Sequence, residues 1–128
     1  MFIHRFEDLD IWKESRSLSR EVFVATGNGL FAKDLRFRDQ MRCSAGSIMD
    51  NIAEGFGREG NKEFIHFLYI AKGSCDELRS QVYRAMDFTY LDTVQAEKLL
   101  KKIEKLSKSL SGFIAYLKKS NFKGQKYK

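Results

Sequence analysis

The sequence contains 128 residues, enough for one domain with a buried core, and its 43% hydrophobic content is ordinary for a globular protein. It has no apolar run of about 18 residues and no apolar signal segment at its N-terminus, so we expect a cytoplasmic protein that does not enter a membrane. The net charge is +6 at pH 7, and positions 118–128 hold five lysines and no acidic residue, which favours a polyanionic partner.

The chain has no proline, so long uninterrupted helices are allowed. Its two cysteines, Cys43 and Cys75, do not form a C-x-x-C pair. We therefore expect two buried free thiols rather than a metal site or a disulfide framework.

A first amphipathic helix is predicted from about Asp8 to Thr26, with an apolar face opposite a charged one. The apolar face consists of Ile11, Leu18, Val22 and Ala25, widened by Trp12 and Phe23. Residues 27–29 (Gly-Asn-Gly) should end this helix, because glycine and asparagine tolerate the left-handed conformation of helix stops. The next residues, Leu30 and Phe31, are expected in a short loop.

A second helix is predicted from about Leu35 to Gly55, and it carries two stripes. Its apolar seam consists of Phe37, Met41, Ala45, Ile48 and Ile52. A polar stripe beside the seam consists of Ser47, Asn51, Glu54 and Arg58. Because polar side chains at the edge of a core need hydrogen-bond partners, this stripe must meet a neighbouring helix, a second subunit or a ligand.

Residues 55–60 read Gly-Phe-Gly-Arg-Glu-Gly and match the dinucleotide-binding spacing G-x-G-x-x-G. A dinucleotide site needs this loop after a strand and before a helix. Here the loop follows a predicted helix, and the sequence shows no pattern of parallel strands. We therefore interpret the glycines as a helix end and a tight turn between antiparallel helices.

A third helix is predicted from Asn61, taken as its N-cap, to about Phe88. Its apolar seam consists of Phe64, Leu68, Ala71, Cys75, Leu78, Val82 and Ala85. A second polar stripe consists of Glu63, Ser74, Glu77 and Gln81. Five large side chains lie off the seam, namely Ile65, Tyr69, Ile70, Tyr83 and Phe88. So many off-seam side chains favour a subunit interface over scattered exposure.

A fourth helix is predicted to begin with a capping box formed by Asp92 and Gln95. Its heptad pattern consists of Ala96, Leu99, Ile103, Leu106, Leu110, Phe113 and Leu117. Four amphipathic helices with short loops predict an all-α, up-down-up-down antiparallel four-helix bundle. We assign the bundle to residues 1–118 and a basic, flexible C-terminal tail to residues 119–128.

Enzyme interpretations find little support. Glu63 and His66 have the spacing of a di-iron ligand pair, but that site needs a second pair, and the only other histidine is His4. Ser47 and Ser74 have no histidine at a spacing that suggests activation. We therefore predict a non-enzymatic protein with no catalytic residue, no metal and no cofactor.

The two polar stripes are predicted to meet across the hairpin of the second and third helices and to fix helix register or subunit pairing. This structural polar network consists of Ser47, Asn51, Glu54, Arg58, Glu63, Ser74 and Glu77. An antiparallel hairpin would bring Glu54 and Arg58 level with Glu63, and would bring Gln40 or Arg42 level with Glu77.

Nucleic acid is predicted to bind through phosphate contacts with little sequence preference. The candidate residues are Lys98, Lys101, Lys105, Lys108, Lys118, Lys119, Lys123 and Arg42. Further candidates are Arg16, Arg20, Arg36 and Arg38. The alternative interpretation is a solvated helix face followed by a disordered tail.

Several motifs, in matching order, resemble a bacterial protein family. They are residues 6–13 (Phe-Glu-Asp-Leu-Asp-Ile-Trp-Lys), 40–42 (Gln-Met-Arg), 47–55 (Ser-Ile-Met-Asp-Asn-Ile-Ala-Glu-Gly), 63–64 with 67–68, and 71–74 (Ala-Lys-Gly-Ser) with Glu77. The family is the 23S rRNA intervening-sequence proteins, small four-helix bundles often encoded within insertions in the large ribosomal RNA gene. Its relatives include the accessory variability proteins of diversity-generating retroelements.

The resemblance implies a four-helix bundle that assembles as a homopentamer and is basic enough to bind nucleic acid, with no established catalytic activity. The chain departs from the family pattern at Cys43, where a second basic residue usually follows the position of Arg42. Our first hypothesis is an oligomer that binds RNA or DNA electrostatically. The second is a protein-interaction scaffold or accessory factor, for example for a reverse transcriptase.

Overall fold

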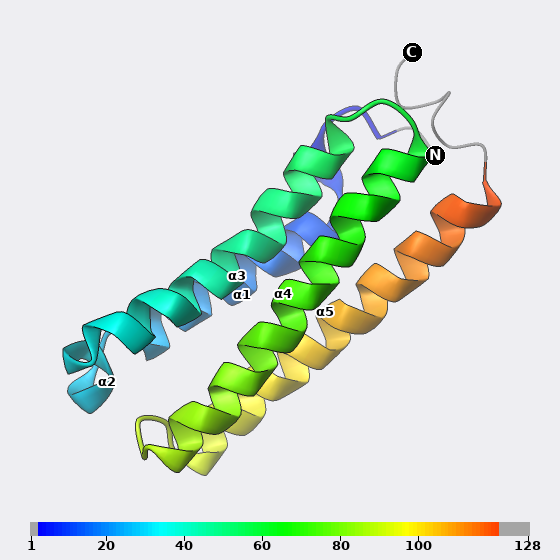
Figure 1. Cartoon of the computed structure of the whole chain (residues 1–128). Coiled ribbons are helices and arrows are strands. Elements are labelled where there is room, and N and C mark those ends of the chain that lie inside the picture. The colour runs from blue at the N-terminus through cyan, green and yellow to red at the C-terminus, as the bar shows by residue number, and fades with distance from the viewer. Residues whose placement is uncertain (1–2, 121–128) are drawn as a thin grey trace.

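The structure is a computed structural model that describes residues 3–120, and four long helices dominate it (Figure 1). They are α1 (Asp10–Ala25), α3 (Leu35–Phe56), α4 (Asn61–Asp87) and α5 (Thr93–Lys119). A 3-10 turn, η1 (Phe6–Asp8), precedes α1, and a short helix, α2 (Gly29–Lys33), joins α1 to α3. The described residues contain no strand, and the predicted all-α fold is confirmed.

Each long helix packs against two others. Helix α3 lies between α1 and α4, and α5 closes the bundle between α4 and α1. A short turn joins α3 to α4 at one end of the bundle, and another joins α4 to α5 at the opposite end (Figure 1). Neighbouring helices are therefore antiparallel, which confirms the predicted up-down-up-down arrangement.

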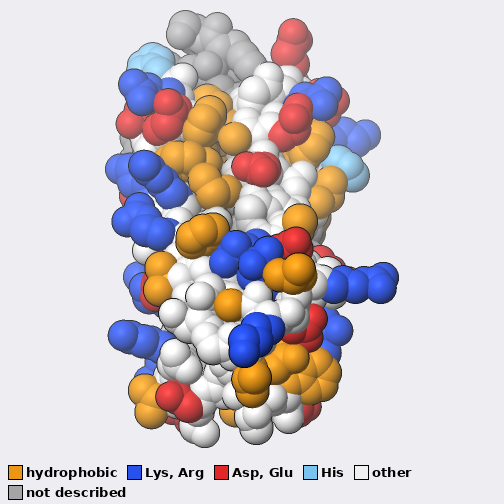
Figure 2. All heavy atoms as spheres, turned by 90° about the vertical axis from the view of Figure 1, so that its left-hand side faces the viewer, with side chains coloured by type: hydrophobic (Ala, Val, Ile, Leu, Met, Phe, Trp, Pro, Cys, Tyr) orange, Lys and Arg blue, Asp and Glu red, His pale blue; other side chains and the backbone are white. Residues whose placement is uncertain are grey.

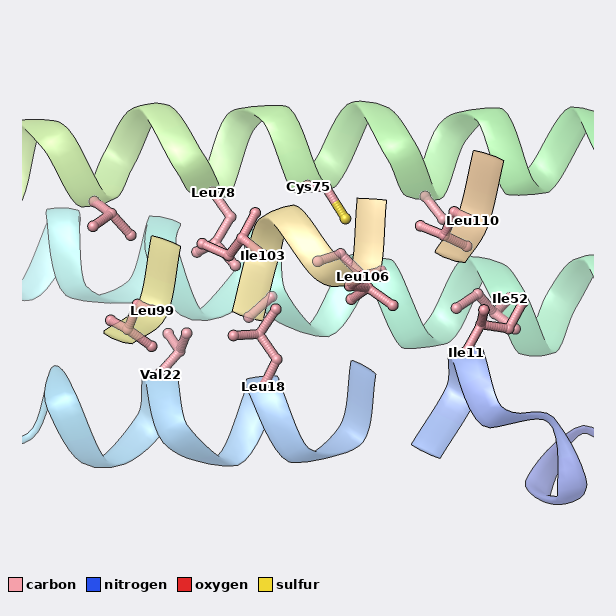
Figure 3. Close-up of a cluster of buried hydrophobic side chains, with 14 of the residues drawn as sticks. Ile11, Leu18, Val22, Ile52, Cys75, Leu78, Leu99, Ile103, Leu106 and Leu110 are labelled. Carbon is pink, nitrogen blue, oxygen red and sulfur yellow. The ribbon is translucent and has the colours of Figure 1, made fainter. Parts of the chain in front are cut away.

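The core consists of the apolar seams of the four helices, whose side chains point toward one another (Figure 3). Burial of these side chains supplies the main stabilisation of the bundle. Among those buried are Ile11, Leu18, Val22, Ile52, Cys75, Leu78, Leu99, Ile103, Leu106 and Leu110. The predicted seams of α3 and α4 are buried in full.

Two predicted core positions are wrong. In α5 the buried residue is Ile114, and Phe113 lies partly buried at the edge, with its ring centre 5.7 Å from that of Phe64. Between Leu110 and Leu117, a step of three residues leads to Phe113 and a step of four leads to Ile114. Both positions lie on the same helix face, so the periodicity alone cannot tell which of the two side chains is buried. In α1, Phe23 is 59% exposed, because its position falls outside the face that meets the core.

The ends of the helices follow the predicted capping chemistry in most places. The backbone N–H of Gln95 donates to Asp92 at 2.8 Å, and the Gln95 side chain accepts from the Asp92 N–H at 3.1 Å, which confirms the capping box. Gly60 has a φ of 83°, and Gly29 has a φ of 56°. The turn between α3 and α4 and the start of α2 therefore use the left-handed region that glycine allows.

Asn61 does not cap α4, contrary to the prediction, because Gly60 occupies the N-cap position. The side-chain amide of Asn61 instead donates to the backbone carbonyls of Leu117 and Ser120, at 2.9 and 3.2 Å. It thereby satisfies carbonyls at the C-terminal end of α5 that have no partner within their own helix.

The predicted loop after α1 contains a helical turn. Phe31 of α2 is fully buried, and its ring lies 5.3 Å from that of Phe37 and 5.1 Å from that of Tyr90. This anchoring holds α2 against the start of α3, whereas Leu30 beside it is exposed. A five-residue helix held by one tertiary anchor leaves little periodicity to detect.

Helix α5 continues to Lys119, one residue beyond the predicted limit of the bundle. Residues 121–128, which make up most of the predicted tail and include Lys123, lie outside the described residues. Within residues 3–120, no helix combines the length and the apolar content needed to span a bilayer.

Candidate nucleic-acid interface and polar groove

The lysines of α5 lie on its solvent-facing side. Lys98, Lys101, Lys105 and Lys108 are all exposed. Lys108 forms an ion pair with Glu104 at 3.4 Å, whereas the other three make no ion pair or hydrogen bond within the described residues. We call Lys98, Lys101 and Lys105 the lysine face; their spacing places their ammonium groups along one side of the helix.

Helix α1 extends this basic surface across its contact with α5. Arg20 and Lys98 line one shared hollow of about 320 Å³, and Lys102 and Lys105 line a smaller one further along the two helices. Lys102, which was not predicted, forms an ion pair with Glu21 of α1. The α1–α5 side therefore combines free and paired cations.

Other predicted nucleic-acid contacts lie elsewhere. Arg42 faces α1: its Nε donates to the Thr26 hydroxyl at 2.8 Å, and its guanidinium lies 4.0 Å from the centre of the Phe23 ring. Lys118 faces α4, where its Nζ donates to the Tyr69 hydroxyl at 2.8 Å.

The structure therefore divides the predicted cations into exposed lysines of α5 and two side chains, Arg42 and Lys118, that contact a neighbouring helix. Lys119 is exposed at the end of α5, and Lys123 lies outside the described residues. Figure 2 shows the spread over one face: several Lys and Arg side chains run in a column along one edge, with acidic and hydrophobic side chains among the others.

Part of the predicted polar network forms at the contact between α3 and α4. The Ser74 hydroxyl donates to the Ser47 hydroxyl at 2.9 Å, which joins the two helices. The Asn51 amide donates to the Ser47 hydroxyl at 3.0 Å and to the Ser47 carbonyl at 2.8 Å. These three residues form one hydrogen-bonded group, as the spacing of the polar stripes indicated.

The charged members of the predicted network do not join this group. Glu54 and Arg58 form an ion pair at 3.0 Å, and both side chains are about half exposed. Glu63 and Glu77 have no hydrogen bond or ion pair among the described residues. Of the two residues predicted to lie level with Glu77, Gln40 lines the same hollow as Glu77, whereas Arg42 turns toward α1.

Toward the other end of the same helix contact, α3 and α4 diverge into an open hollow of about 860 Å³, which we call the polar groove. It is lined by Arg36, Asp39, Gln40, Cys43, Ser44, Ser47, Glu77, Ser80, Gln81 and Arg84. No aliphatic or aromatic residue is among them. The prediction of two buried thiols is half right, because Cys75 is buried but Cys43 is exposed in this groove.

Gln81 lines the polar groove, but its Oε1 atom is shielded from solvent. Its side chain is only 4% exposed, and its Oε1 atom accepts no hydrogen bond among the described residues. An unpaired buried carbonyl of this kind destabilises a fold unless a partner supplies a donor. The polar stripe of the third predicted helix includes Gln81, but nothing in the sequence shows that it lacks a partner.

Large apolar side chains are exposed on α4, as predicted. Tyr69, Ile70, Tyr83 and Phe88 are each between 40% and 50% exposed, whereas Ile65 is partly buried against the core. Further exposed side chains at the α2 end of the bundle are Phe23, Val24, Leu30, Leu35 and Val94.

Burial and hydrogen bonding shift two side-chain pKa values. Burial raises the pKa of the Cys75 thiol to about 12, and the charge of Asp76 adds to the rise. The pKa of Tyr90 is raised because its hydroxyl donates to Asp34 at 2.9 Å. Within the described residues, no three His, Cys, Asp or Glu side chains are grouped so that they could hold a metal ion.

Residues 7–112 match the model of a protein family described as 23S rRNA-intervening sequence protein. The matched region runs from η1 into the second half of α5, so it includes the polar groove and the lysine face. No curated protein matches the chain.

Proposed function

The chain belongs to the 23S rRNA-intervening sequence protein family, and from this premise we propose that it is a non-enzymatic protein that binds the backbone of RNA or DNA. The observation that carries the proposal is the lysine face, since Lys98, Lys101 and Lys105 are exposed and free of ion pairs within the described residues. Exposed ammonium groups can displace the counterions of a polyanion, and the release of those ions favours binding.

The remaining predicted cations have secondary roles in this proposal. Lys108 is exposed but paired with Glu104, and Lys119 extends the basic surface at the end of α5. Arg42 and Lys118 are engaged with neighbouring helices, so we rank their contribution below that of the lysine face.

A mobility-shift experiment with labelled single-stranded RNA and duplex DNA tests the proposal. We expect binding at about 50 mM salt that weakens steeply by about 200 mM, because phosphate contacts depend on counterion release. The same reactions, supplied with Mg²⁺ and left for hours, should leave the nucleic acid uncut. A protein that binds neither probe at low salt would remove the proposal, and cleavage of either probe would remove its non-enzymatic part.

We also propose that the protein is a cytoplasmic homo-oligomer, with five subunits by the family resemblance. The exposed side chains of Tyr69, Ile70 and Tyr83 on α4 support self-association, because a second subunit would remove their apolar surface from water. Light scattering coupled to size-exclusion chromatography measures the solution mass. A monomer at the highest concentration tested would contradict this part.

The second candidate function is that of a scaffold for a protein partner, such as a reverse transcriptase. The exposed side chains Leu30 and Leu35 at the α2 end favour it, because neither belongs to the α5 helix that carries the lysine face. The two functions differ in whether bare nucleic acid is enough for binding. If it is not, and a partner protein is required, the scaffold is the better account.

A further inference from the structure

A further hollow between α1 and α5 differs in charge from the basic surface described above. It has a volume of about 450 Å³ and lies at the end of the bundle where α1 begins and α5 ends. Its lining consists of Ile3, Asp8, Leu9, Asp10, Ile11, Glu14, Ser109, Gly112, Phe113 and Tyr116. We call it the acidic hollow, because three carboxylates and no Lys, Arg or His are among these described residues.

The floor of the acidic hollow is apolar, and the bundle itself does not cover it fully. The Tyr116 side chain is 44% exposed, and Ile3 and Phe113 are only partly buried. Gly112 leaves additional room, since a Cβ atom built on it meets nothing within 4 Å. Because burial of apolar surface favours binding, the floor suits a segment that carries aromatic side chains.

The carboxylates at the rim determine which charge the hollow attracts. Asp8 and Asp10 are exposed, and their side chains form no ion pair or hydrogen bond in the described part of the chain. Glu14 also lines a neighbouring hollow with Lys102 and Lys105, where these two lysines partly offset its charge. Asp8 and Asp10 therefore carry the uncompensated charge of the rim, which attracts a cationic segment and repels a polyanion.

The residues that follow α5 have the matching chemistry. Residues 121–128 read Asn-Phe-Lys-Gly-Gln-Lys-Tyr-Lys, so they combine two aromatic side chains with three lysines and contain no acidic residue. At the other end of the chain, residues 1 and 2 (Met-Phe) adjoin Ile3 but bring no charged side chain to the rim. The charge of the hollow therefore favours the C-terminal segment.

The length of this segment is sufficient to reach the hollow. The described chain leaves α5 at Ser120, whose backbone is extended and whose carbonyl accepts from the Asn61 amide at 3.2 Å. From this point, Tyr116 lies about 6 Å and Ser109 about 17 Å back along the helix axis. Eight extended residues span up to about 26 Å, so they can cross a helix about 10 Å wide and still reach all of the hollow.

We propose that the acidic hollow binds residues 121–128 of the same chain, with their aromatic side chains on its apolar floor and their lysines beside Asp8 and Asp10. The inference does not depend on the proposed function, because it needs no nucleic acid. It has a consequence for that function, since a polyanion must compete with the hollow for Lys123.

Disulfide trapping measures how often the segment occupies the hollow. The full chain carries Cys43→Ser, which leaves Cys75 as a buried, unreactive thiol whose pKa is raised to about 12. Gln125→Cys places one thiol in the segment, and Gly112→Cys places the other in the hollow. In a glutathione buffer, this dithiol is oxidised to a disulfide as one glutathione disulfide is reduced to two thiols.

The matched control moves the second thiol by one residue. Ser111 adjoins Gly112 but faces α4, where its hydroxyl accepts from Lys72 at 2.7 Å. Ser111→Cys with Gln125→Cys therefore keeps the chain length nearly equal and changes the face of α5. We expect the effective thiol concentration of the hollow pair to exceed that of the control pair at least about tenfold, because docking holds the segment beside Gly112. Ser109→Cys, at a second position in the hollow, should show the same advantage.

Removing the charge of the rim should reduce this advantage. Asp8→Asn together with Asp10→Asn should lower the effective thiol concentration of the hollow pair at least about threefold, because the ion pairs with the lysines are lost. Glu7→Gln is the control, since Glu7 already pairs with Arg5 at 3.0 Å and does not line the hollow. It should keep the advantage.

Three results would overturn the inference. The first is equal trapping in the hollow and control pairs, which would mean that the segment does not occupy the hollow. The second is a disulfide that joins two chains, seen in the mass of the denatured, non-reduced protein, which would assign the hollow to a second copy. The third is an advantage that the double aspartate variant leaves unchanged.

Discussion

Two helix pairs of one bundle present surfaces that differ in how they can recognise a partner. The α1–α5 side carries exposed lysines over shallow hollows, so it offers charge with little shape. The α3–α4 side carries a groove of about 860 Å³ that both helices line with polar and charged side chains. A surface that acts by charge responds to salt and tolerates exchange of single residues, whereas a groove depends on individual hydrogen bonds.

The largest expected effect concerns the lysine face. Replacing Lys98, Lys101 and Lys105 together by glutamine should weaken nucleic-acid binding about 10- to 100-fold at low salt, since exposed ion pairs contribute roughly 0.5 to 1 kcal/mol each. Fluorescence anisotropy with labelled RNA measures the change. The control is the double variant in which Arg42 and Lys118 are replaced. These two side chains already have partners within the protein, so the affinity for nucleic acid should fall by less than about threefold. Equal losses in the two variants would erase the distinction between the lysine face and the other cations.

The next effect separates the closed end of the α3–α4 contact from its open groove. A Cβ atom on Gly55 would lie 2.7 Å from the Phe67 Cβ, so Gly55→Ala should lower the free energy of unfolding by about 1 to 3 kcal/mol. A Cβ on Gly46 meets nothing within 4 Å, and Gly46→Ala should raise it by up to about 1 kcal/mol through helix propensity. Denaturant unfolding compares the two. A Gly55→Ala protein as stable as the parent would show that the helices do not approach closely there.

A smaller effect tests the hydrogen-bonded part of the polar stripe against its exposed part. Asn51→Ala removes two hydrogen bonds to Ser47 and should cost about 1 kcal/mol of unfolding free energy. Glu54→Ala breaks only a half-exposed ion pair with Arg58 and should change stability by less than about 0.5 kcal/mol. Thermal melts of both variants give the difference. A larger loss at Glu54 would mean that this carboxylate has a partner in the assembled protein.

The smallest effect at neutral pH concerns the two cysteines. The Cys75 thiol has its pKa raised from 9.0 to about 12, so the fold disfavours its thiolate. The stability that the neutral thiol contributes is present in full below pH 9 and is lost as the pH rises toward 12, by about 1 kcal/mol between pH 8 and 10. Cys75→Ala should flatten this alkaline decline, whereas Cys43→Ala, at an exposed thiol, should leave it unchanged. An identical decline in both variants would show that burial of Cys75 is not its cause.

The four long helices could be predicted because each one repeats apolar residues at a spacing that only one secondary structure explains. The seams of α3 and α4 and the capping box of α5 are local patterns. They can therefore be recognised in the sequence without knowing which helices pack against one another. The three glycines of residues 55–60 were predicted to end a helix and form a turn rather than follow a strand. The segment that precedes them does form a helix, α3.

What the sequence did not disclose are the partners of side chains across helices. Arg42 and Glu77 both lie on polar faces, yet Arg42 bonds to Thr26 at the C-terminal end of α1. Asn61 looked like a cap for the helix it begins, but it bonds to the end of α5, more than fifty positions away. Such pairings depend on the rotation of each helix within the bundle, and periodicity leaves that rotation uncertain by about one residue.

The polar groove was hidden for the same reason. Its lining residues recur at helical spacing on both α3 and α4, as a solvated face also would. The distinguishing fact is the buried carbonyl of Gln81 without a donor, and this is a property of the packed bundle.

The central claim is that nucleic acid binds through the lysine face, and the salt dependence of binding to single-stranded RNA tests it most directly. Each phosphate contact contributes about 0.7 to the slope of log affinity against log salt concentration on single strands. Replacing Lys98, Lys101 and Lys105 should therefore reduce that slope by about 2 relative to the unaltered protein. An unchanged slope would contradict the account, because it would show that these three lysines release no counterions when the protein binds.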